Sequence, residues 1–528
     1  MEILTLVGQK EDNYYQLGLR DREKAKEILN VITNLSSGAN KFLKSAQGLA
    51  SKFIFKKNIK NLQLIKAYSE GLGIFEHEFL SFLITPDLLS GLTAVIPQIP
   101  FFQFGCSSLM YQNEQNNISH LRIFDFPIGA AYTTNERLIS YKFVGEQAYC
   151  GISTSGYPFP SITSFNQSGL TFSLHQKFGH VFNKNGVPIF EIMENLIVNT
   201  TSIEDIIKEL KNLKSISTWG VYISSSKEKK GIAVNLLGET NTYEEFDILP
   251  STFKYFNNQF LNKNINRDQI QPLNFSEYCQ QREIDINKRL KKIETLNDEK
   301  ILKKVSELKN FDDKITVITP SSVLCCIMNP EEEKIIYNAG TYPKIYDGEV
   351  GTLTNVLTKP KQIISHKNIK NELNKGKEFY QQIIESQLAW DKKDFHHAVH
   401  FSQMAEIQQG ENQLIPRFFK NVILSMTTKD KSLLKICLKE FTEMKPKFEG
   451  VFKDYCKLFI FRLERICYSK YSPQYFENDY LVKIFEFEKN IPSLIFQKVT
   501  RDLTSPRFDL NDIIFLHPLS NNDSRITL

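Results

Sequence analysis

The chain has 528 residues, of which 41% are hydrophobic and 12% aromatic, so it can bury two or three domain cores and is not mainly disordered. Its 65 basic and 60 acidic side chains leave a formal net charge of +5, a near balance that gives no reason to expect nucleic acid as a partner. The eight cysteines include no CxxC pair, which favours a reducing, cytoplasmic setting over a disulfide-linked secreted protein.

The first part of the chain, residues 1 to about 80, is predicted to be helical. Residues 20–35 and 58–80 carry apolar positions three and four apart. The N-terminus lacks the basic and apolar regions of a secretion signal, and prolines and an aspartate interrupt the most apolar stretch, residues 79–104. We therefore expect residues 1–105 to form a helical leader that packs on the rest of the chain, and we expect no membrane-spanning segment.

Strand signals begin near residue 95 and continue to about 360. Short runs rich in Ile, Val, Phe and Tyr, bounded by Gly, Asn and Ser, are typical of strands. They cover residues 118–126, 138–144, 169–175, 217–224, 231–238, 314–329 and 333–340. Two helical stretches interrupt them, one after Thr201, which fits a capping box with Glu204, and one from about Tyr278 to Leu308. This order predicts a layered α+β domain over residues 106–360.

After Lys359 the strand signals stop, and amphipathic helical stretches follow between residues 370 and 470. We expect a separate all-helical domain over residues 361–528. Residues 389–406 have the spacing of one tetratricopeptide-like hairpin, but no second unit follows at a fixed period, so a repeat domain is the weaker alternative. His396, His397 and His400 have metal-ligand spacing without the glutamate or cysteine that such sites use, which favours a solvated helix face and no metal.

The passage FQFGCSSLMYQNEQNNISHLRIFDFP, residues 102–127, carries the candidate chemistry. A cysteine whose own α-amino group is free holds its general base on the same residue, so Cys106 would need no catalytic histidine. The amino group, with an ordinary pKa of about 8, can take the thiol proton near neutral pH. Asp125 can hold that amino group, and the cation of Arg122 would favour the thiolate.

Two geometric conditions follow from this passage. Gly105 has no Cβ and so permits the strained backbone that self-cleavage before Cys106 requires. Arg122 and Asp125 are three apart on a strand and point to opposite faces, so local twist or a bulge must let both address one site.

The passage resembles the linear amide C–N hydrolases, a superfamily of N-terminal-nucleophile enzymes that includes choloylglycine hydrolases, penicillin V acylase, acid ceramidase and acyl-CoA:6-aminopenicillanate acyltransferase of peptidase family C45. The resemblance rests on Arg122 sixteen positions and Asp125 nineteen positions after Cys106. It extends over roughly residues 5–355 through further segments at 13–24, 165–176, 187–210, 256–262, 276–282 and 318–343. The segments at 13–24 and 165–176 look most like the acyltransferase branch.

The resemblance implies a four-layer αββα fold and a role for each matching residue. Cys106 would be the nucleophile, Asp125 the positioner of its amino group, Arg122 a pocket or thiolate-stabilising cation, Asn258 an oxyanion-hole donor, and Arg282 a holder of the cut end or of the substrate. His175 could supply a second oxyanion donor, because such a hole needs two donors converging on one point. The sequence departs from the family at Asn257 and Gln259, where Thr and His are common, and at Ile123, where many members have Asn.

Together these patterns predict an autoprocessed amide hydrolase or N-acyltransferase that is cut between Gly105 and Cys106 into two associated fragments. Its substrate would be a small N-acyl amide or an acyl-thioester, acylating Cys106, and it would need no cofactor or metal. A protein partner could bind the C-terminal helices. The alternative hypothesis is a non-catalytic scaffold that uses these helices for interaction, since a fold by itself does not establish activity.

Overall fold

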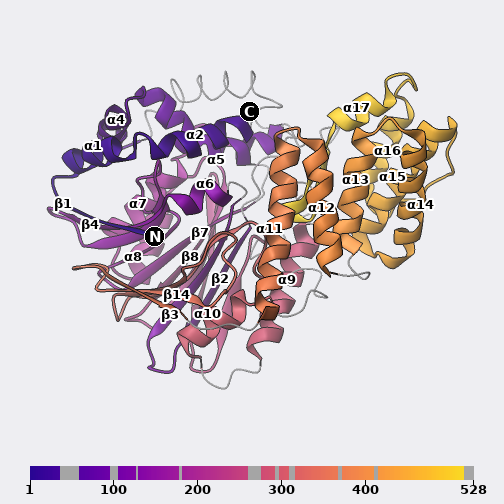
Figure 1. Cartoon of the computed structure of the whole chain (residues 1–528). Helices are drawn as coiled ribbons and strands as arrows, with labels where there is room; N and C mark the ends of the chain where they lie inside the picture. The colour runs from indigo at the N-terminus through magenta and orange to yellow at the C-terminus, as the bar shows by residue number, and fades with distance from the viewer. Residues whose placement is uncertain are drawn as a thin grey trace.

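Two large β-sheets packed face to face form the centre of the molecule (Figure 1). The computed structural model describes residues 1–35, 59–95, 105–126, 129–177, 181–259, 275–291, 296–308, 316–366, 371–409 and 414–515. Helices cover the outer face of each sheet, and a further group of helices lies beside this layered core, coloured orange to yellow in Figure 1. The chain is therefore a mixed α/β protein with a largely helical C-terminal region.

The first sheet has eight strands in the order β1-β4-β5-β6-β7-β8-β9-β10. Its strands are β1 (Glu2–Gly8), β4 (Glu136–Phe143), β5 (Tyr149–Thr154), β6 (Thr163–Asn166), β7 (Leu170–Gln176), β8 (Thr218–Ser225), β9 (Lys230–Leu237) and β10 (Thr240–Asp247). All neighbouring pairs are antiparallel except β1 with β4. The edge strand β10 is largely exposed and carries charged residues, which discourages pairing with other chains.

The second sheet has seven strands in the order β11-β2-β3-β12-β13-β14-β15. Its strands are β2 (Cys106–Gln112), β3 (Ile118–Asp125), β11 (Phe253–Phe256), β12 (Ser322–Asn329), β13 (Lys334–Asn338), β14 (Glu349–Thr354) and β15 (Lys361–His366). Every residue of β3 and β12 is buried. Both faces of these central strands are covered, and the polar side chains that β3 carries, among them Arg122 and Asp125, are therefore buried as well.

Buried side chains fill all three interfaces between the layers. Phe124 and Cys326 of the second sheet pack with Leu138 and Phe165 of the first. The first sheet's outer face packs against α1 (Lys10–Asp21), α4 (Leu62–Leu72), α5 (Glu76–Val95), α7 (Ile189–Asn199) and α8 (Ile203–Leu210). The second sheet's outer face packs against α9 (Phe275–Leu290) and α10 (Asp298–Ser306). The layer order is therefore helix, sheet, sheet, helix.

The N-terminal part differs from the prediction of a purely helical leader. Residues 2–8 form strand β1, which extends the first sheet beside β4 and is followed by α1, α2 (Lys24–Leu35), α4 and α5. Helices α1 and α4 cross at Gly18 and Gly71, where a Cβ on Gly18 would lie 2.3 Å from the carbonyl oxygen of Tyr68. No local pattern marked the pairing of β1, because its partner strand lies more than a hundred residues away.

The helical segments inside residues 106–360 are more numerous than predicted. Helix α8 begins after Ser202, whose side chain accepts from the backbone N–H of Asp205, so the cap lies one residue beyond the predicted Thr201–Glu204 box. The long helix expected over residues 278–308 is divided into α9 and α10. The chain also forms α6 (Gly129–Thr134), which no pattern predicted, and α7, which lies in segment 187–210, a segment that resembles a helical stretch of the family.

The C-terminal region contains helices that pack in succession, but it is not all-helical. The helices are α11 (Asn371–Asp391), α12 (Phe395–Gln409), α13 (Leu414–Thr427), α14 (Lys431–Met444), α15 (Gly450–Tyr468), α16 (Asp479–Lys489) and α17 (Phe496–Asp502), with short 3₁₀ turns η4 (Lys445–Lys447) and η5 (Phe508–Leu510). Strand β15 extends the second sheet beyond Lys359, and β16 (Thr504–Arg507) pairs with β17 (Asp512–Phe515). Among the described helices, none is long and apolar enough to cross a bilayer.

Candidate active site

Cys106 is the first residue of β2 and lies at one end of the inter-sheet core. It pairs with Phe124 of β3, and only 1% of its surface is exposed. Its neighbours at alternate positions, Ser108 and Met110, also face the first sheet, because side chains alternate along a strand. The Cys106 side chain therefore points between the two sheets.

Arg122 contacts the sulfur of Cys106 directly. Its Nη2 lies 2.9 Å from Cys106 Sγ and donates a hydrogen bond of 2.6 Å to the carbonyl oxygen of Leu174 on β7. Burial raises the pKa of the Cys106 thiol, and the charge of Arg122 opposes this increase. The thiol is thus held beside a cation but stays protonated at neutral pH unless a base takes its proton.

The backbone nitrogen of Cys106 is held by Asn258. The N–H of Cys106 donates to Asn258 Oδ1 at 2.8 Å, and Asn258 Nδ2 donates to the carbonyl oxygen of Gln176 at 2.9 Å. Asn258 is 1% exposed and lies directly after strand β11, which pairs with β2. The structure therefore places Asn258 at the amide nitrogen of Cys106, and the predicted role as oxyanion donor stays a prediction.

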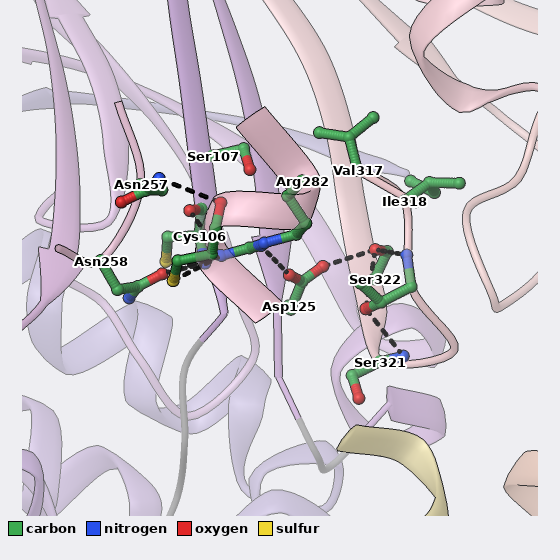
Figure 2. Close-up of polar contacts among 12 residues, drawn as sticks. Cys106, Ser107, Asp125, Asn257, Asn258, Arg282, Val317, Ile318, Ser321 and Ser322 are labelled. Atoms are coloured by element: carbon green, nitrogen blue, oxygen red, sulfur yellow. Dashed lines mark hydrogen bonds and ion pairs between the residues drawn. The ribbon is translucent and has the colours of Figure 1, made fainter. Parts of the chain in front are cut away.

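Asp125 approaches Cys106 from the opposite side of the second sheet. Arg122 faces the first sheet, whereas Asp125 faces the outer helices, where Arg282 Nη1 on α9 binds its Oδ2 at 2.9 Å. Arg282 Nη2 also lies 3.3 Å from the carbonyl oxygen of Cys106 and 3.2 Å from Asn258 Oδ1. Figure 2 shows Arg282 reaching from Cys106 to Asp125, with Ser322 on the other side of the carboxylate. Arg122 thus contacts the sulfur of Cys106, whereas Asp125 is linked to the backbone of Cys106 through Arg282.

A bulge in β12 supports this arrangement. The register of β12 against β3 shifts between Ser322 and Leu324, directly opposite Asp125. Ser322 Oγ donates a hydrogen bond to Asp125 Oδ1. Burial raises the pKa of Asp125, and Arg282 followed by Ser322 opposes the increase. The irregularity lies in the neighbouring strand and aims a hydroxyl at the carboxylate.

Close approach of a carboxylate accounts for glycine at position 105. A Cβ at this position would lie 2.4 Å from Asp125 Oδ2, so there is no room for a side chain. The φ of Gly105 is not in the left-handed region, and the strained backbone expected during self-cleavage stays a prediction. The carbonyl oxygen of Gly105 accepts a hydrogen bond of 2.8 Å from the backbone N–H of Asp125.

His175 lies deeper between the sheets than the other predicted residues. Its Nε2 is 2.7 Å from Ser108 Oγ, and its ring contacts Tyr222 edge to face. Burial lowers its pKa well below the usual value, which keeps the ring neutral. These contacts engage the ring with Ser108 instead of with the Cys106 sulfur, so the structure does not place this side chain where an oxyanion donor would be needed.

An apolar cavity of about 90 Å³ opens beside Cys106. Helix α5 and the ends of both sheets line it, mainly with aliphatic and aromatic side chains that include Phe82, Phe124, Tyr132, Ile162 and Trp219. Its few polar side chains are uncharged, so the cavity suits an apolar group joined to a carbonyl at the sulfur.

Sequence reasoning missed several residues that complete this site. Ser322 and most of the cavity-lining residues, such as Trp219 and Ile162, belong to segments far from Cys106 in the chain, and no local pattern marks them. Asp87 on α5 was also missed: it is buried and accepts hydrogen bonds from the N–H of Ile189 and from Ser217 and Trp219. The one available signal was an aspartate within the apolar part of α5, which follows the acidic first turn of the helix.

Comparisons with known proteins add little to this geometry. No protein-family model matches the chain, and no curated protein matches it. One similar solved structure is a Caenorhabditis elegans N-acylethanolamine-hydrolyzing acid amidase (NAAA) ortholog, with 14% sequence identity over 43% of this chain and 93% of that chain and a TM-score of 0.33. A TM-score this low does not establish a shared fold, so the proposed function depends on the geometry of the site.

Proposed function

We propose that the protein is an N-terminal-nucleophile amide hydrolase or acyltransferase that cuts its own chain before Cys106. One observation carries the proposal: Cys106 has a cation at its sulfur, a side-chain amide at its backbone nitrogen and an apolar cavity beside it. The order of layers and the resemblance of the sequence to linear amide hydrolases support the same function.

The first step of the proposal is self-cleavage. The Cys106 sulfur attacks the carbonyl carbon of Gly105, and the N–H of Asp125 stabilises the charge that develops on the carbonyl oxygen. The C–N bond breaks, the nitrogen takes the thiol proton, and a thioester links Gly105 to the sulfur. Water then hydrolyses this thioester, which leaves a carboxylate on Gly105 and a free α-amino group on Cys106.

The second step uses that amino group as the base. An N–H donated to Asn258 Oδ1 would orient the nitrogen, and its lone pair takes the thiol proton. The thiolate beside Arg122 attacks a substrate amide or thioester, the proton passes to the leaving amine or thiol, and the acyl group remains on the sulfur. Water or an amine then resolves the acyl-enzyme. Because burial raises the pKa of the thiol, this internal base is needed near neutral pH.

Intact-mass measurement tests the proposal. Wild-type protein should give two fragments divided between Gly105 and Cys106, whereas Cys106→Ala should stay whole. The fragments should remain together without denaturant, because α1, α4 and α5 share one core with the first sheet. Incubation with acyl-thioester donors should then acylate only the new N-terminal cysteine. A whole wild-type chain whose Cys106 resists acylation would favour the scaffold alternative.

A further inference from the structure

The C-terminal helical region contacts the loop whose last residue donates a hydrogen bond to the side chain of Asp125. This loop, residues 316–322, leads into β12 and carries Ser322, the hydroxyl partner of Asp125. Hydrogen bonds within it fix Ser322: Thr319 N–H donates to Ser322 Oγ at 2.9 Å, and Ser322 N–H donates to the Thr319 carbonyl at 3.0 Å. Any displacement of the 316–322 loop therefore moves the hydroxyl away from Asp125.

Helix α11 holds the beginning of this loop. The hydroxyl of Tyr380 lies 3.0 Å from Thr316 Oγ1 and 3.3 Å from the carbonyl oxygen of Ile318. Burial raises the pKa of Tyr380 to about 12, so the hydroxyl stays neutral and able to donate. The first helix of the C-terminal region is thus bonded to the loop through a side chain.

The turn η5 holds the other end of the loop. Ser321 Oγ donates to the carbonyl oxygen of Asp509 at 3.0 Å and lies 3.4 Å from Asp509 Oδ2. The turn is itself anchored, because Arg507 binds Asp509 at 2.6 Å and the N–H of Phe508 donates to Gln387 of α11 at 2.7 Å. Figure 2 shows this turn, in yellow, directly below Ser321.

We propose that Tyr380 and Asp509 are positioning residues of the active site: through the 316–322 loop they keep Ser322 on Asp125, so the C-terminal region controls the reactivity of Cys106. The inference rests on the proposed function. Neither residue touches Cys106 or the cavity, and both act through the loop. A region that contributed only general stability would have no reason to contact the loop at both ends through buried polar groups, which are costly to bury unless bonded.

The test compares Ser321→Ala, Tyr380→Phe, Asp509→Asn and the double variant Ser321→Ala/Tyr380→Phe with wild type. The rate of cleavage before Cys106 is followed by intact mass across pH, and Cys106 labelling by iodoacetamide is followed by peptide mass. Ser321→Ala and Tyr380→Phe each remove hydrogen bonding to the loop and should each slow cleavage by about threefold to tenfold, the range that corresponds to one hydrogen bond. Asp509→Asn keeps the carbonyl that Ser321 binds but loses the charge paired with Arg507, which anchors the turn, and should slow cleavage in the same direction. The fall in cleavage rate on the acid side of the pH profile should also move to higher pH. The hydrogen bond from Ser322 lowers the pKa of Asp125, so weakening this bond raises that pKa further.

Controls separate positioning from loss of folding. Tyr475→Phe, at a side chain that is 81% exposed, and Asp502→Asn, in a surface ion pair, should leave the rate and its dependence on pH unchanged. Ser321→Thr keeps a hydroxyl and should restore most of the rate. If wild type cleaves, and the folded double variant cleaves at the same rate with the same dependence on pH, the positioning role of Tyr380 and Asp509 is wrong while the proposed function stands. A wild type that neither cleaves nor labels would overturn the proposed function and the inference with it.

Discussion

Arg282 and Asp125 form an ion pair that is closed to solvent on both sides. Their Nη1 and Oδ2 atoms lie 2.9 Å apart, and the side chains are 0% and 1% exposed. The pair joins α9 to the end of β3 at the backbone of Cys106. It therefore links the stability of the outer helix to the geometry of the nucleophile.

Removal of the carboxylate charge should destabilise the protein strongly. Asp125→Asn leaves the Arg282 guanidinium buried without its counter-ion, a change that typically costs about 3–5 kcal/mol. Denaturant unfolding measures this directly. The matched control is Asp502→Asn, whose ion pair with Arg501 is exposed and should contribute under about 1 kcal/mol. Equal effects of the two variants would contradict a structural role for the buried pair.

The amide of Asn258 should control the rate of self-cleavage. Asn258→Leu removes the acceptor of the Cys106 N–H, and an unsatisfied buried donor costs about 1–3 kcal/mol, or about fivefold to 150-fold in rate if the cost falls on the transition state. A time course of precursor and fragments by intact mass measures the change. Asn257→Leu, at the adjacent position, serves as the control and should slow cleavage less. Unchanged processing in Asn258→Leu would remove this residue from the mechanism.

Arg122 should set the pH at which Cys106 reacts. Its charge lowers the pKa of a thiol that burial raises, so Arg122→Met should raise that pKa further. Iodoacetamide labelling of Cys106, followed by peptide mass, should then need a pH higher by about one unit or more. Arg501→Met, a surface change, should not move the labelling midpoint. A midpoint that shifts to lower pH in Arg122→Met would show that this cation does not stabilise the thiolate.

Asp87 should make stability depend on pH in the acid range. Burial raises its pKa from 3.8 to about 6, so the folded state binds a proton more tightly than the unfolded chain does. The bound proton of Asp87 therefore adds to the free energy of unfolding. This added stability is fully present below pH 3.8 and is lost as pH rises through 6, a total loss of about 3 kcal/mol.

Asp87→Asn cannot ionise, so its unfolding free energy should not change over this window as that of wild type does. Unfolding curves at pH 4.5 and pH 7, read from tryptophan fluorescence in a Trp390→Phe background so that the signal comes from Trp219, whose Nε1 donates to Asp87, measure the difference. Identical slopes of stability against pH in wild type and variant would show that the carboxyl is not buried as described.

Residues close together in the sequence were the ones that could be predicted. The order of strand runs predicted a layered α+β core, and each of those runs contains a strand of one of the two sheets. Glycine, cysteine, arginine and aspartate at a characteristic spacing singled out Cys106, Arg122 and Asp125. The structure brings these three residues to one place, and their roles remain predictions.

Other parts of the site could not be predicted because their partners are distant in the chain. Ser322 lies 197 residues from Asp125. Asn258 lies 152 residues from Cys106 and was named only through the family resemblance, which did not predict its contact with the Cys106 nitrogen. The pairing of β12 with β3 and of β11 with β2 brings them together. His175 was expected to supply an oxyanion donor, and only the structure shows that its side chain on β7 is directed toward Ser108.

The sequence by itself determined the nucleophile motif and the alternation of strands and helices, because both depend on neighbours a few positions apart. Tertiary structure decided which groups surround that nucleophile: the acceptor at its nitrogen, the cation behind Asp125, the cavity, and the contact from the C-terminal region. Pairing between strands and packing between layers set these distances. Local sequence patterns predict strands and helices but do not specify which distant residues will be paired, so these contacts could not be read from the sequence.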